Sequence, residues 1–286
     1  MLRLNGKEVS AVRRAQLKSK LKDFCNRTNH TPGLAVVLVG DDPASHVYVG
    51  GKIRACAEAG INSFEHRLPV DTTSAQLKCL IEKLNDDIAV DGILVQLPLP
   101  KGLDSNKVLG WIDPDKDVDG LTPSSMGHLW LDKPRATPCT PSGVMAILNY
   151  YNIAVEGLKA VVVGRSNIVG KPMAYLLTQA NATVTICHSK TKDLPSYTRD
   201  ADIVVVAAGK PQMLGKEDFK RGSIVIDVGI HHQPVKDGKN KLFGDVRFEE
   251  LEGWVKAATP VPGGVGPMTI SMLLENTLHL AELNHI

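Results

Sequence analysis

A tyrosine and a lysine four residues apart, Tyr48 and Lys52, could form a catalytic pair in this chain. If the segment is helical, the two side chains lie on the same face of the helix. A lysine acts as a base near neutral pH only when burial or a neighbouring cation lowers its pKa from about 10.4. Apolar residues flank Lys52, so partial burial is expected. The alternative is a solvated lysine beside a half-buried tyrosine, separated by two poor helix formers, Gly50 and Gly51.

A glycine-containing turn follows a predicted strand in the segment AVVVGRSNIVGKPMAYLL. Gly164 can form a sharp turn, and the free amides at the start of the next helix could hold a pyrophosphate. The segment departs from the G-x-G-x-x-G pattern, because Ser166 replaces the second glycine and Gly170 lies one position late. The turn indicates a nucleotide site, with an ordinary strand-to-helix turn as the alternative.

The end of the following predicted strand indicates which nucleotide is bound. NAD-binding sheets usually carry an acidic residue there, which accepts hydrogen bonds from the ribose hydroxyls. This chain instead has His188, Ser189, Lys190 and Lys192, and Arg165 in the glycine turn could bind a phosphate through two hydrogen bonds. We therefore expect NADP rather than NAD, unless these basic residues form only a solvated strand end.

The run DPDKDVDG is similar to the start of a calcium-binding loop. Asp115, Asp117, Asp119 and Gly120 match positions 1, 3, 5 and 6 of an EF-hand loop. Position 12 is Met126, where a bidentate glutamate is needed. We expect no calcium site here, and we expect these aspartates to form turns through side-chain bonds to the backbone, one of them facing a polar ligand.

Strands that alternate with helices predict an α/β protein with parallel sheets. In the first half we expect helices at residues 8–25, 44–59 and 72–86, and strands at residues 33–40, 61–69 and 90–100. In the second half we expect strands at residues 159–164, 182–187, 202–209 and 223–229, and a last helix at residues 266–283. Residues 110–142 are rich in Pro, Asp and Ser, and they are expected to form a long loop that crosses between domains.

Composition excludes several functional classes. A net charge of +2 without a dense basic stripe argues against a nucleic-acid partner. The five cysteines are scattered and form no C-x-x-C, which suits a reducing compartment better than a disulfide framework. The chain shows neither a signal-peptide pattern nor an apolar run of membrane-spanning length. We expect a cytoplasmic protein of one large or two ordinary domains.

Eight segments spread over the chain are similar to the bifunctional methylenetetrahydrofolate dehydrogenase/cyclohydrolase family, and they occur in the family's order and spacing. They are YVGGKIRACAEAGI, DGILVQLPLP, PDKDVDGLTPSSMG, TPCTPSGVMAIL, VVVGRSNIVGKPMAYLL, ATVTICHSKT, DVGI and TPVPGGVGPMTISMLLENT. One departure follows Asp119, where this chain reads LTPSSMG and many bacterial members have Phe-His-Pro.

The resemblance implies a two-domain α/β fold with an active-site cleft between the domains. Residues 1–137 with 262–286 are expected to form a folate-binding catalytic domain, and residues 138–261 a Rossmann-type NADP-binding domain with a parallel sheet. The implied activity is NADP-dependent oxidation of 5,10-methylenetetrahydrofolate to the methenyl form, followed by hydrolysis to 10-formyltetrahydrofolate. The resemblance also implies a homodimer that pairs through its nucleotide domains. We expect no metal, because the cofactor accepts the hydride and the sequence has no His/Cys cluster at metal spacing.

The same resemblance assigns roles to individual residues. Lys52 is implied as the central catalytic residue with Tyr48 as its helper, Gln96 as the partner that tunes the lysine, and Asp119 as the residue that holds the pterin ring. The resemblance implies that the folate cleft is also lined by Pro262, Gly263 and Gly264. It implies that NADP is contacted by Gly164, Arg165, Ser166, Ser189 and Ile230.

Three other interpretations compete with this one. Short-chain dehydrogenases also use Tyr-x-x-x-Lys, but their nucleotide turn precedes the pair, whereas here Tyr48 precedes Gly164. A monofunctional dehydrogenase of the same fold is a second alternative, because hydrolysis depends on the pKa and geometry of Lys52. A non-catalytic folate- or nucleotide-binding relative is the third.

Overall fold

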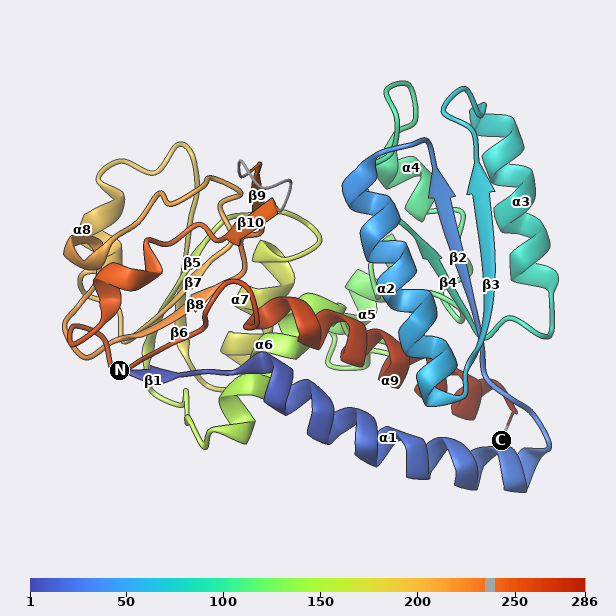
Figure 1. Cartoon of the computed structure of the whole chain (residues 1–286), viewed down its shortest axis with the longest axis horizontal. Helices are drawn as coiled ribbons and strands as arrows, with labels where there is room; N and C mark the ends of the chain where they lie inside the picture. The colour runs from blue at the N-terminus through green and yellow to red at the C-terminus, as the bar shows by residue number, and fades with distance from the viewer. Residues whose placement is uncertain (235–239, 286) are drawn as a thin grey trace. The chain divides into compact units, whose positions relative to one another are not determined.

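The computed structural model describes residues 1–234 and 240–285, which divide into two compact units (Figure 1). One unit comprises Met1–Ala11 with Thr140–Thr269, and the other comprises Val12–Cys139 with Ile270–Ile286. We call them the nucleotide unit and the lysine unit, after the glycine turn in the first and Lys52 in the second. Each unit is described separately.

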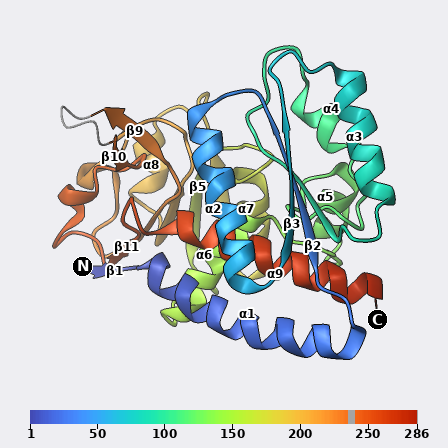
Figure 2. The same cartoon turned by 45° about the vertical axis from the view of Figure 1, so that its right-hand side comes forward.

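The lysine unit is built on a three-stranded parallel sheet in the order β3-β2-β4. The strands are β2 (Gly33–Val39), β3 (Asn62–Leu68) and β4 (Gly92–Val95). Every residue of β2 and β4 is buried, as expected for strands covered on both faces. Helix α2 (Pro43–Ala59) packs against β2 and β3 (Figures 1 and 2). The predicted strands in this half are confirmed, but the third is shorter than expected, because β4 ends at Val95 rather than at residue 100.

Local sequence explains where the helices of the lysine unit begin and end. Asp42 caps α2 by accepting a hydrogen bond from the Ser45 amide at 2.8 Å, and Gly60 ends the helix with a φ of 91°. Helix α3 (Ser74–Asp86) begins with a capping box between Thr73 and Gln76. Both predicted helices are confirmed, with Thr73 as the N-cap of α3.

The prediction of a continuous loop over residues 110–142 is wrong. Helix α5 (Pro123–Trp130) lies inside this segment, and helix α6 (Cys139–Tyr150) begins before its end. Thr122 caps α5 and Pro123 occupies its first turn, where a missing amide hydrogen costs nothing. Pro123 therefore marks a helix start, which the proline-rich composition of the segment made hard to recognise. The short helix α4 (Ser105–Leu109) precedes it.

The nucleotide unit contains a six-stranded parallel sheet in the order β1-β11-β8-β7-β5-β6. The strands are β1 (Leu2–Arg3), β5 (Lys159–Val163), β6 (Thr183–Cys187), β7 (Ile203–Val206), β8 (Ile224–Asp227) and β11 (Ala257–Ala258). Strand order reverses at β5, which lies between β6 and β7. In parallel α/β sheets such a reversal is the usual site for a ligand.

Short elements surround this sheet. They are α7 (Gly170–Gln179), α8 (Leu194–Thr198), the 3₁₀ helices η1 (Lys216–Asp218) and η2 (Phe248–Leu251), and an antiparallel pair of strands, β9 (His231–Pro234) and β10 (Asn240–Phe243). The four strands predicted for this half are confirmed, whereas β1, β9, β10 and β11 were not anticipated. Two of these four have only two residues, too few for a recognisable alternation.

Two long helices contribute residues to both units, since the boundaries fall within α1 (Gly6–Thr28) and α9 (Val265–His285). The division differs from the expected domain bounds at two places, because Met1–Ala11 and residues 262–269 belong to the nucleotide unit rather than to the lysine unit. Strand β1 adds to the sheet of that unit through β11, and Glu8 accepts a hydrogen bond from Tyr150 at 2.9 Å. Within residues 1–234 and 240–285, we find no helix with the length and apolar character needed to cross a membrane.

Candidate active site and nucleotide site

Lys52 is directed at the end of a neighbouring strand. It lies in α2, and its Nζ donates a 2.9 Å hydrogen bond to Oε1 of Gln96, the residue that follows β4. The Gln96 amide is itself oriented, because its Nε2 donates to the Leu97 carbonyl at 2.6 Å. The amide group thus presents its oxygen to the lysine. The predicted pairing of these two residues has a direct structural basis.

Asp119 lies close enough to Lys52 for their charges to interact. Both side chains retain some exposed surface, yet loss of solvation is the largest influence on each pKa. Burial lowers the pKa of Lys52, and the Asp119 carboxylate opposes that shift only in part. Burial likewise raises the pKa of Asp119, against the influence of Lys52. The lysine is therefore easier to deprotonate than a solvated one, which is what a base near neutral pH requires.

Tyr48 is one helical turn before Lys52 in α2 and is partly buried. Burial raises the pKa of its phenol, so the group stays protonated and can donate a hydrogen bond at neutral pH. The two glycines between them have ordinary surroundings. A Cβ on Gly50 would lie 3.5 Å from the Arg54 guanidinium, and one on Gly51 would lie 3.7 Å from Ile270. No described protein segment explains why these positions are glycine.

The loop that carries Asp119 is held by contacts that sequence inspection missed. Asp117 pairs with Ile93 of β4 in an isolated bridge, and its carboxylate accepts from the Thr122 amide at 2.7 Å. The prediction that the aspartates of this run form turns is confirmed for Asp117. On α9, the Asn276 side chain donates 2.9 Å hydrogen bonds to the carbonyls of Val118 and Thr137.

Cys139 is a second neighbour of Asp119 that sequence inspection treated only as a small buried residue. Burial and the adjacent Asp119 charge raise the pKa of its thiol well above the ordinary value. The thiol is therefore neutral and can donate to the carboxylate, which lowers the pKa of Asp119. The only sequence feature that could have indicated this role is the position of a polarisable residue, Cys139, at a helix start in the motif TPCTPSG.

A pocket of about 360 Å³ lies at the carboxyl ends of β5, β6 and β7 in the nucleotide unit. Four of the predicted nucleotide contacts line it: Gly164, Arg165, Ser166 and Ser189. His188 also lines it, whereas Lys190 and Lys192 do not. The fifth predicted contact, Ile230, lies between β8 and β9 and is exposed.

Backbone crowding explains the glycines of this turn. Gly164 has a φ of 136°, and a Cβ there would lie 2.2 Å from the Ala207 carbonyl oxygen. A Cβ on Gly170 would lie 2.3 Å from the Gly164 carbonyl oxygen. Ser166, in the position of the missing second glycine, accepts hydrogen bonds from the amides of Val169 and Gly170 at the start of α7. The turn is therefore closed tightly on itself, although it departs from the usual glycine spacing.

Lys210 lines the same pocket and was not predicted. It follows the strand segment DIVVVAAG, as Arg165 and His188 follow the two preceding strands. Because the carboxyl ends of parallel strands meet at one edge of a sheet, the three basic residues share this edge. The same reasoning applied to the third strand would have found Lys210.

The three remaining predicted residues, Pro262, Gly263 and Gly264, belong to the nucleotide unit and precede α9. Gly263 has a φ of 103°, and its carbonyl accepts from the Lys7 amide at 3.2 Å. Gly264 is packed against Gly6, where a Cβ would lie 1.8 Å from the Gly264 oxygen. Close backbone packing and a positive φ explain why glycines occupy this turn. A contact with a ligand would be a second role.

The fold and these two sites define a nucleotide-dependent enzyme of the two-domain α/β dehydrogenase class. Residues 4–119 match the catalytic domain of tetrahydrofolate dehydrogenase/cyclohydrolase, and residues 138–285 match the NAD(P)-binding domain of the same enzyme. The chain belongs to the tetrahydrofolate dehydrogenase/cyclohydrolase family.

Individual relatives agree with this assignment over nearly the whole chain. A bifunctional protein FolD from Bdellovibrio bacteriovorus is 59% identical over 282 residues, which cover 99% of this chain and 97% of that protein. The crystal structure of FolD from Campylobacter jejuni, a methylenetetrahydrofolate dehydrogenase/cyclohydrolase, has a TM-score of 0.93 at 48% identity, covering 99% of both chains. The Trypanosoma brucei enzyme, solved with NADP and an inhibitor, has a TM-score of 0.95 at 38% identity, covering 99% of this chain and 98% of that one.

Proposed function

We propose that this protein is a bifunctional one-carbon folate enzyme. It oxidises 5,10-methylenetetrahydrofolate to 5,10-methenyltetrahydrofolate with NADP and then hydrolyses the product to 10-formyltetrahydrofolate. The observation that carries this function is the hydrogen bond between Lys52 and Gln96 beside Asp119, in a chain that also has a pocket at the carboxyl ends of β5, β6 and β7. The dehydrogenase reaction needs the pocket, and the hydrolysis needs the lysine.

NADP is the cofactor that the residues of the nucleotide pocket fit. Gly164, Arg165 and Ser166 of the turn between β5 and α7 line the pocket, and we assign the pyrophosphate to this turn. We assign the 2′-phosphate to Arg165, with His188, Ser189 and Lys210 on the same pocket wall. When bound, NADP supplies the hydride acceptor for the oxidation. The protein contributes binding and orientation of the reacting groups.

We propose that Lys52 manages the proton in the hydrolysis. Water adds to the electrophilic methenyl carbon, and the neutral amine of Lys52 takes the proton that the water loses. Cleavage of one of the two carbon–nitrogen bonds then leaves the formyl group on the other nitrogen, and a proton returns to the departing nitrogen. A neutral amine also avoids repelling the cationic substrate. Burial, which lowers the pKa of Lys52, supports this role.

Gln96, Asp119 and Tyr48 complete the proposed folate site. The Gln96 oxygen holds Lys52 in place without adding charge. We assign Asp119 to the pterin, whose amino and ring N–H groups could donate two hydrogen bonds to one carboxylate. Tyr48 is assigned as a proton donor one turn from the lysine. Pro262, Gly263 and Gly264 are proposed as further folate contacts, on the family resemblance alone.

Assays of the two half-reactions on purified protein test this function. Methenyltetrahydrofolate formation with NADP is followed by absorbance, and its hydrolysis is followed separately from synthetic methenyl substrate. We expect both activities in one polypeptide. Oxidation without hydrolysis would identify a monofunctional dehydrogenase, and neither activity would identify a non-catalytic relative.

We further propose a homodimer that pairs through the nucleotide unit. Strand β6 is an edge of the six-stranded sheet, and among the described residues it pairs with β5 only. Its side chain Ile186 is 40% exposed, and Tyr197 in the adjacent α8 is 43% exposed. An edge strand with exposed apolar groups is a ready pairing surface, which a second copy would cover.

We also propose that the protein works in the cytoplasm. The support is the state of its cysteines, since Cys25, Cys56, Cys79, Cys139 and Cys187 are all free thiols. Free thiols, one of them exposed, suit a reducing compartment. Fractionation of the producing cells tests this location.

A further inference from the structure

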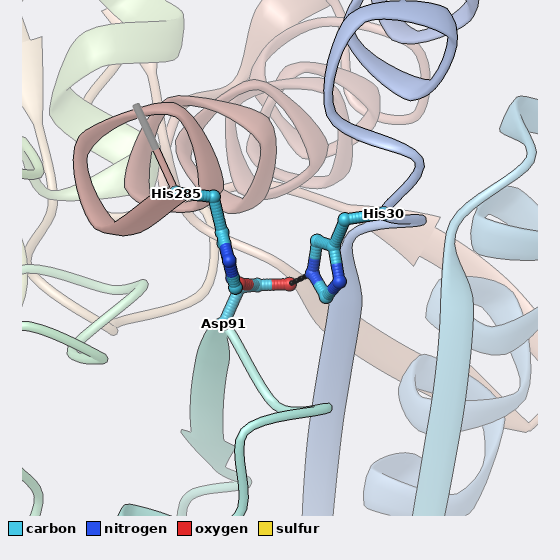
Figure 3. Close-up of side chains that lie close together, drawn as sticks. All are labelled: His30, Asp91 and His285. Atoms are coloured by element: carbon cyan, nitrogen blue, oxygen red, sulfur yellow. Dashed lines mark hydrogen bonds and ion pairs between the residues drawn. The ribbon is translucent and has the colours of Figure 1, made fainter.

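Two histidines and an aspartate from distant parts of the lysine unit meet at the end of α9. His30 lies between α1 and β2, Asp91 immediately precedes β4, and His285 is the last residue of α9 (Figure 3). Each imidazole Nε2 lies 2.8 Å from a different oxygen of the Asp91 carboxylate. The three side chains belong to no part of the proposed folate or nucleotide sites.

The geometry of this cluster suits a single metal ion. One donor atom from each residue can be chosen so that all three lie within 4.8 Å of one another. Ligands bound tetrahedrally to zinc at about 2.0–2.2 Å are separated from one another by about 3.3–3.6 Å. The observed nitrogen–oxygen distances of 2.8 Å are those of hydrogen bonds, so the side chains must move apart by about 0.5–0.8 Å to admit an ion.

The two imidazoles stack beside the carboxylate. The ring centroids are 3.9 Å apart, with an interplanar angle of 28°. Ring nitrogens from both imidazoles can serve as ligands to one cation, whose positive charge the Asp91 carboxylate balances.

Surrounding contacts hold the ligands as a metal site requires. The Gly33 amide donates to Asp91 Oδ2 at 2.7 Å, which fixes the carboxylate. The His30 amide donates to the Thr28 hydroxyl at 3.2 Å, which fixes the start of its loop. Asp91 is 2% exposed, whereas His30 and His285 are 21% and 29% exposed. Solvent can therefore deliver an ion and complete its coordination with water.

We propose that His30, Asp91 and His285 form a binding site for a divalent transition-metal ion of the zinc type, which fastens the last turn of α9 to β4. Imidazole nitrogens select such ions, whereas magnesium and calcium prefer oxygen ligands. The site has no part in hydride transfer or hydrolysis. Sequence spacing could not reveal it, because the three ligands are separated by 61 and 194 positions.

Titration of the untagged full chain with zinc tests the proposal. Calorimetry should show one tight zinc site per chain and no comparable magnesium or calcium binding. Cobalt should give a visible spectrum of nitrogen and oxygen coordination without thiolate charge transfer, which separates this site from the exposed Cys79. Zinc should also raise the melting temperature, since a ligand that binds only the folded state stabilises it.

Two variants and a control decide the result. His30→Gln and His285→Gln keep an amide that can donate to Asp91 but remove a metal ligand, and each should weaken zinc binding by at least the roughly 10–100-fold known for outer-shell changes. His279→Ala, an exposed histidine on the same helix, should bind zinc as the unaltered chain does. Absence of saturable zinc binding, or equal binding by the His30→Gln/His285→Gln double variant, would overturn the proposal.

Discussion

Burial decides what Lys52 can do. A solvated lysine is almost fully protonated at neutral pH and cannot accept another proton. In this protein the loss of solvation lowers its pKa, and Asp119 restores only part of the shift. The sign of the pH dependence follows: the neutral fraction of the amine, and with it the hydrolysis rate, should rise as pH increases toward the lowered pKa. The hydrolysis should therefore be active at a lower pH than a solvated lysine would allow.

Lys52→Met should remove the cyclohydrolase activity and leave the fold intact. Methionine fills a similar volume and lacks the amine, so hydrolysis should fall by about 100-fold or more. Initial rates with methenyl substrate measure the effect, while circular dichroism and NADP titration check the fold. Lys78→Met, at an exposed lysine paired with Glu82 in α3, is the control and should keep full activity. A Lys52→Met protein that hydrolyses normally would refute the assignment.

A second buried acid makes stability depend on pH. Asp227 ends β8, accepts hydrogen bonds from the amides of Gly229, Asp245 and Val246, and lies beside the buried Asp245 carboxylate. Burial raises the pKa of Asp227 to about 7, against the influence of the three amides. In the folded state it therefore binds a proton that the unfolded chain has already released near pH 4. Its contribution to stability is present at low pH and is lost as pH rises toward 7.

Asp227→Asn should consequently change the pH dependence of unfolding. The variant loses an acceptor at every pH, but its deficit relative to the unaltered protein should shrink by about 2–3 kcal/mol between roughly pH 5 and pH 8. Urea unfolding across this range measures the difference. Asp202→Asn is the control, because hydrogen bonds from Lys220 and Lys159 lower the pKa of Asp202, so its deficit should stay constant in this range. A constant deficit for Asp227→Asn would contradict the raised pKa.

Helix α2 carries two glycines that its own packing does not require. Because little obstructs a Cβ at either position, Gly50→Ala and Gly51→Ala should each stabilise the protein by about 0.5–1 kcal/mol through helix propensity. We also expect each to raise the KM for folate, on the hypothesis that substrate approaches this face of the helix. Thermal unfolding and steady-state kinetics measure the two effects. Gly127→Ala, in the open surroundings of α5, should stabilise without changing KM; an unchanged KM at Gly50 and Gly51 would reject the hypothesis.

The ends of three strands together should select NADP over NAD. Arg165, His188 and Lys210 line one pocket, whereas Lys190 and Lys192 do not. We expect NADP to bind at least about tenfold more tightly than NAD, since a hydrogen bond to a charged group contributes about 1.5–3 kcal/mol. Arg165→Ala should reduce that ratio, and Lys192→Ala should leave it unchanged. Fluorescence titration with both nucleotides measures it, and equal dissociation constants in the unaltered protein would defeat the 2′-phosphate argument.

At the scale of the whole molecule, the exposed edge at β6 sets the expected assembly. Ile186→Lys places a charge on this edge and should convert a dimer into a monomer, because a buried unpaired charge opposes association. Light scattering coupled to size-exclusion chromatography measures the mass. Leu2→Lys, at the exposed β1 on the opposite edge of the same sheet, should remain dimeric. Monomeric unaltered protein at high concentration would exclude this interface.

Much of the fold was predictable because its determinants are local. The apolar run of β2, the cap at Thr73 and the stop at Gly60 each depend on neighbours within a few positions. The elements that were not predicted are those for which the neighbouring sequence is uninformative. Helix α5 was hidden in a proline-rich segment, and β1 is a strand only because β11 lies beside it. A strand of two residues is too short to show the alternation by which strands are recognised in a sequence.

By itself the sequence determined the chemistry available: a lysine flanked by apolar residues, a glycine turn after a strand, and basic residues where NAD sites have an acid. Tertiary structure decided which of these groups meet. Lys52 donates to the Gln96 oxygen, and Cys139 and Asn276 contact the loop that carries Asp119. His30 and His285 both lie beside the Asp91 carboxylate. The physical reason is range, since hydrogen bonds and charge interactions act over a few ångströms, and strand order sets which distant residues come that close.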